Sequence, residues 1–249
     1  MLKGLRTPLG FAIEFLTIIP LPGRFELLDD KDVAKSAAYF PIVGLLIGAC
    51  LWGCWVLLSK YLPSDVLRLL IVILLVLITG GLHLDAIADT FDAVAARKTV
   101  AEKLLIMKSS TVGPFGVGAI VFCIMLKYLL LKQPLTISTY PLLLFPVVGR
   151  ATCVYAMYTG SSASKEGLGR LFIDNTTLGV FMASLLMTVL ITAGSDIRWL
   201  LNLLACYAFT HLGVLTSQKL LGGLNGDVLG ALIELNEILF LLILNINMV

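Results

Sequence analysis

The chain has 249 residues, of which 59% are hydrophobic and 14% are charged, and its mean hydropathy is +0.99. A soluble domain carries about a quarter charged residues, so this composition excludes an ordinary soluble protein and predicts an integral membrane protein. The net charge of +2 comes without a basic cluster, so we expect no nucleic-acid partner. No long repeat or linker interrupts the chain, which predicts a single membrane domain over residues 1–249, and the N-terminus shows no cleavable-signal pattern.

Apolar runs predict the elements of the fold in chain order. Residues 8–22 form a short apolar run broken by Glu14 and closed by prolines, which favours an interfacial or re-entrant helix. Residues 99–108 are typical of a short amphipathic surface helix. Seven longer runs are suited to cross a bilayer, at about 37–58, 66–84, 112–131, 137–158, 178–194, 199–216 and from 228 to the C-terminus. The sequence therefore predicts an all-α, polytopic membrane bundle of about seven transmembrane helices plus an N-terminal interfacial helix.

Basic residues orient these spans. Thirteen of the 18 Lys and Arg residues fall on the N-terminal side of the predicted membrane. The remaining five are Lys60, Arg68, Lys127, Lys132 and Arg198. The positive-inside rule then places the N-terminus, residues 85–112 and the loops at 159–177 and 217–230 in the cytoplasm. We expect a multi-pass protein of the cell inner membrane with its functional residues on the cytoplasmic face.

The stretch Gly80–Ala93 (GGLHLDAIADTFDA) places three aspartates directly after the second apolar run. On a continuing helix, Asp85, Asp89 and Asp92 would lie on one face, within about 60° of one another. The first basic residue downstream is Arg97, so these carboxylates would repel one another unless a cation lies among them. Oxygen ligands favour a hard divalent ion, usually Mg²⁺ where phosphate is the other partner. The stretch predicts a metal site, and the alternative is a solvated polar helix end.

A second group of carboxylates lies in Gly222–Glu237 (GGLNGDVLGALIELNE). Asp227 and Glu234 are seven residues apart and share a helix face, and Glu237 lies one turn further on. An ionised carboxylate at the start of a span costs several kcal/mol unless it is paired or bound to a metal. Glu234 and Glu237 are therefore functional candidates, and the alternative is that they are protonated or pack within the bundle.

Other polar features are less specific. Val112–Gly118 (VGPFGVG) opens the third span, where backbone N–H groups could hold a phosphate, although its glycines equally favour tight helix packing. Arg150 lies in an apolar run and must find an anion or reach the interface, and a substrate phosphate is one option. His83 points away from Asp85 and is expected to contact a helix. Lys165–Arg170 forms a basic loop that is typical of topological charge.

Six stretches resemble the adenosylcobinamide-GDP ribazoletransferases, also called cobalamin-5′-phosphate synthases, over essentially the whole chain. They are Phe15–Pro22, Pro41–Gly44, Gly81–Ala93, Ile106–Gly116, Gly167–Gly169 and Gly222–Glu237. Two departures stand out. Ala86 replaces the usual glycine, and Lys108–Thr111 lacks the acidic residue and arginine of the family, so no ionic role is expected for Ser109 or Thr111.

The resemblance implies a membrane enzyme that joins adenosylcobinamide-GDP to α-ribazole or its 5′-phosphate, releases GMP and requires Mg²⁺. An incoming ribose hydroxyl would cleave a pyrophosphate. Asp85, Asp89 and Asp92 are assigned to magnesium, and either Asp92 or Asp227 would take the hydroxyl proton. The substrate-binding residues that accompany them are Glu234, Glu237, Arg150, Gly113, Gly116 and Lys108.

Three alternatives share part of this pattern. A CDP-alcohol phosphotransferase uses an aspartate helix, but its Asp-Gly and Ala-Arg pairs are absent at the required spacings. A polyprenyl transferase normally carries two separate Asp-rich motifs. A cation-coupled transporter could use intramembrane carboxylates, but these would lie near the bilayer midplane. Magnesium-dependent release of GMP distinguishes the transferase from the transporter.

Overall fold

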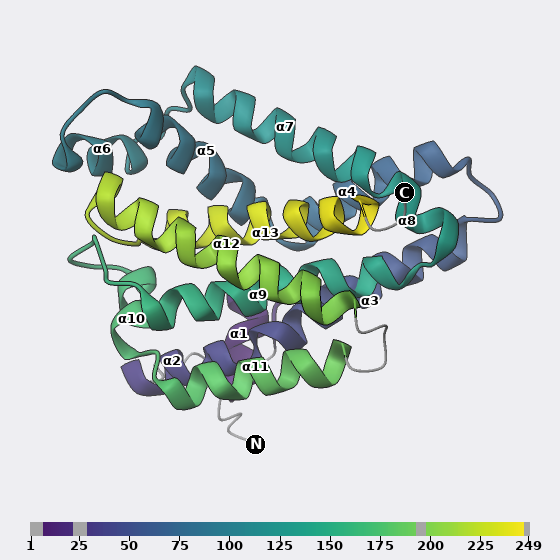
Figure 1. Ribbon diagram of the computed structural model, residues 1–249, viewed down its shortest axis with the longest axis horizontal. Helices are drawn as coiled ribbons and strands as arrows, with labels where there is room; N and C mark the ends of the chain where they lie inside the picture. The colour runs from purple at the N-terminus through teal and green to yellow at the C-terminus, as the bar shows by residue number, and fades with distance from the viewer. Residues whose placement is uncertain (1–6, 22–28, 193–197, 247–249) are drawn as a thin grey trace.

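Long helices lie side by side along the longest axis of the molecule (Figure 1). The computed structural model describes residues 7–21, 29–192 and 198–246. The helices are α1 (Pro8–Leu16), α2 (Asp30–Ser36), the 3-10 turn η1 (Ala37–Tyr39), α3 (Phe40–Leu58), α4 (Ser64–Ile78), α5 (Leu82–Ala95), α6 (Val100–Met107), α7 (Pro114–Leu130), α8 (Lys132–Ile137), α9 (Tyr140–Thr159), α10 (Leu168–Asn175), α11 (Leu178–Thr192), α12 (Arg198–Leu221) and α13 (Gly226–Ile246). Within the described ranges, β-pairing is limited to one isolated bridge between Ser162 and Leu224. The predicted all-α class is confirmed.

Five helices of the described chain are long and apolar enough to cross a membrane, or seven if each of two bent helix pairs is one span. The bent pairs are α4 with α5, at 87°, and α10 with α11, at 96°. Counted in this way, the structure confirms the prediction of about seven spans. The predicted ends at 193–194 and beyond 246 lie outside the described residues. Figure 1 places α6 and α10 at one end of the bundle, and α8 with the α3–α4 connection at the other.

The second predicted span is interrupted near its C-terminal end, and here the straight helix expected from the sequence is wrong. Gly80 and Gly81 have φ angles of +62° and +71°, a region that glycine reaches without steric cost. α4 therefore ends at Ile78, and its carbonyl accepts a 2.8 Å hydrogen bond from the backbone N–H of Ile18. This hydrogen bond pairs a carbonyl group that the break in the helix would otherwise leave without a partner. As a result, the aspartates lie on a separate helix, α5.

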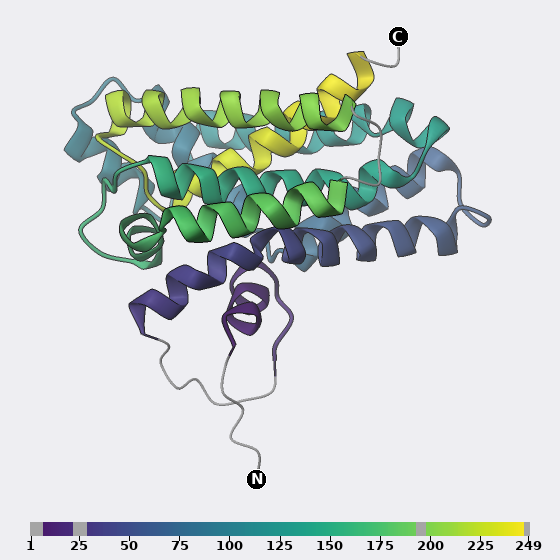
Figure 2. The same cartoon turned by 60° about the horizontal axis from the view of Figure 1, so that its bottom comes forward.

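The N-terminal helix α1 lies beneath the bundle and crosses the direction of the long helices (Figure 2). Its Phe15 ring lies 6.1 Å from that of Phe40 and 5.2 Å from that of Phe172, measured between centroids. Phe40 and Phe172 pack edge to face at 5.4 Å. These spacings are favourable for aromatic pairs, and they join α1 to α3 and α10.

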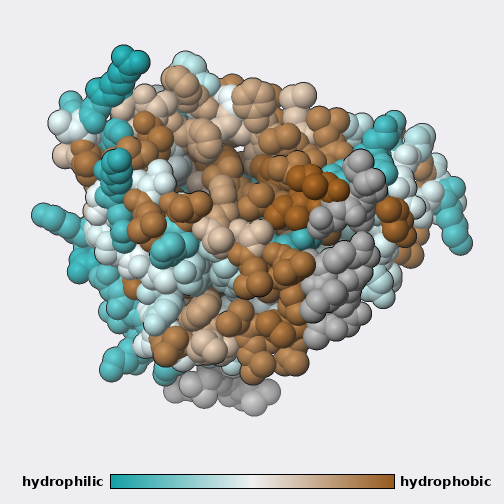
Figure 3. Space-filling view, viewed as in Figure 1, coloured by the Kyte–Doolittle hydropathy of each residue, from teal (hydrophilic) through white to brown (hydrophobic). Residues whose placement is uncertain are grey.

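Helix α9 is the most buried of the candidate spans, and α3 packs directly against its backbone. A Cβ atom at Gly44 would lie 2.6 Å from the carbonyl oxygen of Pro146, and one at Gly48 would lie 2.4 Å from that of Leu143. Small residues at such positions let membrane helices pack backbone to backbone. Figure 3 shows apolar side chains across the middle of the surface and polar ones toward its two ends, as expected for a protein in a bilayer.

Candidate active site

Helix α5 carries the three aspartates of the first motif and keeps them close to a fourth carboxylate. Asp89 is half-buried, and the negative charges of Asp85, Asp227 and Asp92 all act on it. The predicted common face of the aspartates is thus present, although on a short helix. Like charges gathered in this way favour binding of a cation.

A close contact between α5 and α13 brings Asp227 to this group. A Cβ atom at Gly230 would lie only 2.5 Å from the Cβ atom of Ala86. Ala86 directly follows Asp85, and Gly230 lies one helical turn after Asp227. The two small residues therefore set the distance between the helices that carry these two carboxylates.

Asn225 orients Asp227, a role that the sequence analysis missed. Its side-chain amide donates a 3.1 Å hydrogen bond to Oδ2 of Asp227, and its carbonyl oxygen accepts one of 2.9 Å from the N–H of Val228. The second contact caps the N-terminus of α13, as asparagine at this position often does. The sequence signal that could have revealed this role is an asparagine placed two residues before an acidic residue at the start of a predicted helix.

The turn that holds Asn225 is fixed by a second loop. Leu224 donates to the carbonyl of Ser161 and accepts from the N–H of Ala163, each at 2.7 Å. A Cβ atom at Gly169 would lie 2.6 Å from the backbone nitrogen of Gly226. The Gly167–Gly169 motif and the Gly222–Glu237 motif, distant in sequence, therefore meet beside Asp227.

Asp92 has a different environment from that of a free metal ligand. Its two carboxylate oxygens accept hydrogen bonds of 2.6 Å from the N–H of Gly113 and 2.8 Å from that of Gly116. A Cβ atom at either glycine would lie 2.6 Å or less from the nearer of these oxygens. Asp92 thus caps α7, where the helix dipole favours a negative charge. The two N–H groups predicted for a substrate phosphate are donated to Asp92 instead.

Glu234 and Glu237 lie in a buried ion network rather than beside the aspartates. Lys127 donates a 2.7 Å hydrogen bond to Glu234 and a second one to Glu237. Arg150 pairs with Glu237, and its other terminal nitrogen lies 3.4 Å from Nδ1 of His83. Both cations and both glutamates are at most 4% exposed.

This network changes the interpretation of three predicted substrate-binding residues. Arg150 meets a carboxylate of α13 instead of an outside phosphate, because the fold itself supplies its anion. The two glutamates obtain their cations from α7 and α9, as a buried charge requires. Lys127, read from the sequence as a topological charge, is the cation that joins them. His83 contacts a neighbouring helix, as expected.

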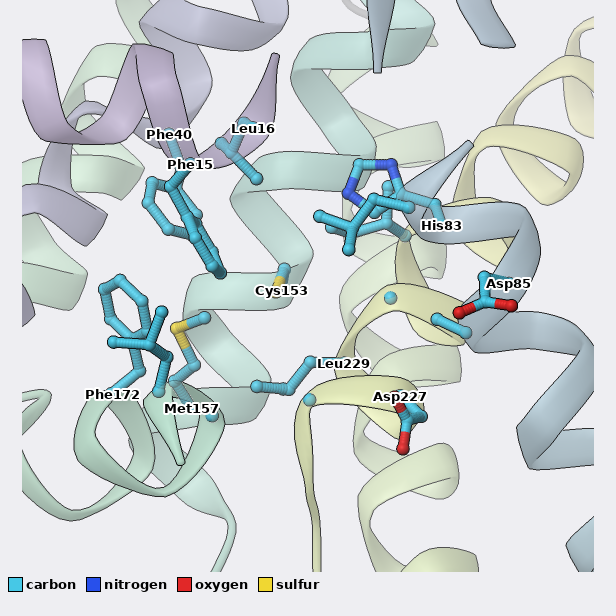
Figure 4. A pocket seen from close by; sticks show the side chains of 17 residues that line it. Phe15, Leu16, Phe40, His83, Asp85, Cys153, Met157, Phe172, Asp227 and Leu229 are labelled. Carbon is cyan, nitrogen blue, oxygen red and sulfur yellow. The ribbon is translucent and has the colours of Figure 1, made fainter. Parts of the chain in front are cut away.

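Two cavities meet at Asp227. The first, which we call the aromatic chamber, has a volume of about 180 Å³ and is walled by Phe15, Phe40, Cys153, Met157, Phe172 and Leu229, with Asp85 and Asp227 on one side (Figure 4). The second, which we call the basic groove, measures about 690 Å³ and carries Lys108, Lys165 and Arg170. Lys108, one of the predicted substrate-binding residues, lines this groove, while the other two cations and the chamber were not recognised as site features.

A metal ion at this site would have few protein ligands. Within the described parts of the chain, no three His, Cys, Asp or Glu side chains are grouped as a preformed metal site. Magnesium commonly takes only one or two carboxylates and completes its shell with water and substrate phosphate. Asp85 and Asp89, one turn apart and short of basic partners, fit that type of donor set.

Comparison with known proteins agrees with the sequence motifs. The family model for cobalamin-5-phosphate synthase matches residues 8–245. A protein of Geotalea daltonii named adenosylcobinamide-GDP ribazoletransferase is 39% identical over 240 residues, which is 94% of each chain. Proteins of the same name from Alkaliphilus oremlandii and Caldanaerobacter subterraneus are each 36% identical over 92% of this chain and 92% and 93% of their own. No solved structure matches the chain.

Proposed function

This chain belongs to the cobalamin-5-phosphate synthase family, and we propose that it is an adenosylcobinamide-GDP ribazoletransferase of cobalamin biosynthesis. The relatives that carry this name match the chain over nearly its whole length. The structural observation that supports the proposal is the position of Asp227, between a group of carboxylates and a groove lined by three cations. Such a junction suits the transfer of a phosphoryl group that carries several negative charges.

The acceptor of the reaction is α-ribazole or its 5′-phosphate. A ribose hydroxyl of the acceptor forms a bond to the phosphorus that bears the cobinamide, and the bond from that phosphorus to the GMP oxygen breaks. The hydroxyl proton passes to a carboxylate, and GMP leaves as a phosphate monoester. We assign the proton to Asp227 rather than Asp92, because both oxygens of Asp92 already accept hydrogen bonds from α7.

The remaining polar residues have complementary roles. Asp85 and Asp89 would hold a magnesium ion together with the diphosphate, and the ion would neutralise charge on the phosphate oxygens. Lys108 and Lys165 bind the nucleotide phosphate from the basic groove. Arg170 lies beside them and is held by Asp174, whose carboxylate is 2.9 Å from its Nε.

We place this site at the cytoplasmic face of the cell membrane. Most of the Lys and Arg residues in the described ranges belong to segments at the motif-bearing end of the bundle, which the positive-inside rule assigns to the cytoplasm. A nucleotide substrate approaching from the cytoplasm then meets the basic groove without crossing the bilayer.

The test is release of GMP from adenosylcobinamide-GDP by the protein purified in detergent. We expect GMP only when α-ribazole or its 5′-phosphate and magnesium are both present, and none after addition of EDTA. Omitting the acceptor measures background hydrolysis. If no GMP forms with all components present, the proposed activity is wrong. If turnover ignores EDTA, the magnesium assignment alone is wrong.

A further inference from the structure

The aromatic chamber is an apolar cavity that opens beside the proposed reacting carboxylates. Phe40 and Phe172 are 0% exposed and Cys153 is 2% exposed, whereas Asp85 on the opposite side is accessible to solvent. Figure 4 shows the aromatic rings on one side of the chamber and the two aspartates on the other. A ligand that fills it would bury its apolar part among the rings and present its polar part to Asp85 and Asp227.

The rings of the chamber favour a flat aromatic ligand. Phe15 stacks on Phe40 at 6.1 Å with 27° between the planes, and Phe40 lies 5.4 Å from Phe172 at 66°. Stacked and edge-on surfaces are thus both present at one cavity, which suits a planar π-system. The Met157 thioether adds a polarisable contact of the kind that favours aromatic edges.

The chemistry of the wall excludes the other ring systems of the reaction. Among the side chains that line the chamber, the nitrogen and oxygen donors or acceptors are those of His83, Asp85 and Asp227 alone. His83 lies against Arg150, and both aspartates lie at the mouth. Guanine or adenine would leave several polar atoms unpaired in this wall, at a cost of about 1–3 kcal/mol each. A corrin ring is far larger than about 180 Å³.

We propose that the aromatic chamber binds the benzimidazole base of the acceptor nucleoside and thereby holds its ribose beside Asp227. This assignment rests on the proposed function and adds the position of one substrate. The donor then lies in the basic groove, which shares Gly226 and Asp227 with the chamber, and its diphosphate extends past Asp227 toward Asp85 and Asp89. The two substrates therefore approach the reacting phosphorus from opposite cavities.

Two substitutions of the wall test the assignment by changing its size in opposite directions. Cys153→Leu narrows the chamber, and Met157→Ala widens it. Each variant is assayed with α-ribazole, whose base is dimethylbenzimidazole, and with the riboside of unsubstituted benzimidazole. Cys54→Leu on α3 is the matched control, because Cys54 is half-buried and lines neither cavity.

We expect Cys153→Leu to raise the KM for α-ribazole about tenfold or more, because adding or removing one methylene group in an apolar pocket changes substrate binding by about this factor. The KM for the smaller riboside should rise less. Met157→Ala shifts the preference toward the larger base. The KM for adenosylcobinamide-GDP stays unchanged in both variants, and the control behaves as wild type. If the KM changes equally for both ribosides, or changes only for adenosylcobinamide-GDP, the assignment is wrong. The chamber would then bind an acyl chain or serve only helix packing.

Equilibrium dialysis of α-ribazole against the purified protein, without donor, separates this inference from the proposed function. Binding that Cys153→Leu weakens and Cys54→Leu does not supports the chamber even if no GMP is released. If GMP is released normally while binding and KM ignore Cys153→Leu, the chamber assignment alone is wrong.

Discussion

The carboxylate of Asp92 accepts a 2.6 Å hydrogen bond from the backbone N–H of Gly113, which fixes the C-terminal half of α5 to the start of α7. A second bond from Gly116 occupies its other oxygen. The aspartates of one motif therefore divide into two roles. Asp92 holds two helices together, while Asp85 lines the aromatic chamber with Asp227, and Asp89 lies close to both.

The first prediction separates these roles by two matched substitutions. Asp92→Asn replaces one acceptor oxygen by an NH₂ group that faces a backbone donor, so we expect a loss of about 1–2 kcal/mol in stability. Asp85→Asn leaves the thermal unfolding midpoint unchanged and lowers GMP release about a hundredfold or more. Thermal unfolding in detergent measures the stability of each variant, and the GMP assay measures its activity. Identical behaviour of the two variants would contradict the division of roles.

The second prediction concerns the distance between α5 and α13. Gly230→Ala places a Cβ atom 2.5 Å from that of Ala86 and forces the helices apart, so we expect reduced stability, by about 1–3 kcal/mol, and reduced activity. Adding Ala86→Gly removes that contact, and the next nearest atom, in His83, is 3.7 Å away. The double variant should regain activity. If Ala86→Gly gives no rescue, this contact does not set the position of Asp227.

The third prediction concerns the buried ion network. Arg150→Met leaves Glu237 with less positive charge inside the bundle, so we expect a loss of about 3–5 kcal/mol. Combining it with Glu237→Gln should cost less than the sum of the single changes, because the two residues pair directly. Arg150→Lys should lower stability and activity together at an unchanged KM. A raised KM at unchanged stability would instead restore the substrate-phosphate role.

The fourth prediction concerns topology. Single cysteines at Ser64 and Ser110, both exposed, are introduced after replacement of the five native cysteines. Ser64 begins α4, next to the α3–α4 connection, and Ser110 follows α6; Figure 1 places these two segments at opposite ends of the bundle. A membrane-impermeant thiol reagent should therefore label Ser110→Cys from the cytoplasmic side and Ser64→Cys from the other. Labelling of both from one side is incompatible with seven alternating spans.

The sequence by itself determined the class of fold, the approximate spans and the family. An apolar run of about 20 residues is long enough to cross the hydrocarbon core of a bilayer as a helix, so such runs predict the spans. The spacing of Asp85, Asp89 and Asp92 gave their common face, because helical periodicity is a local property that α5 retains. The motifs carried the family resemblance, which the comparison with relatives confirmed.

Only the tertiary structure decided which partner each polar residue has. Lys127 and Glu234 are separated by 107 positions, and Arg150 and Glu237 by 87, so no local pattern links them. The 87° bend at Gly80 and Gly81 and the approach of Gly230 to Ala86 turn the aspartate helix against α13. Buried charges must be neutralised by whichever cations the packing brings near. Helix packing therefore creates the buried ion network, the cap that Asp92 forms at α7 and the aromatic chamber. The hydrophobic periodicity of a single segment cannot predict them.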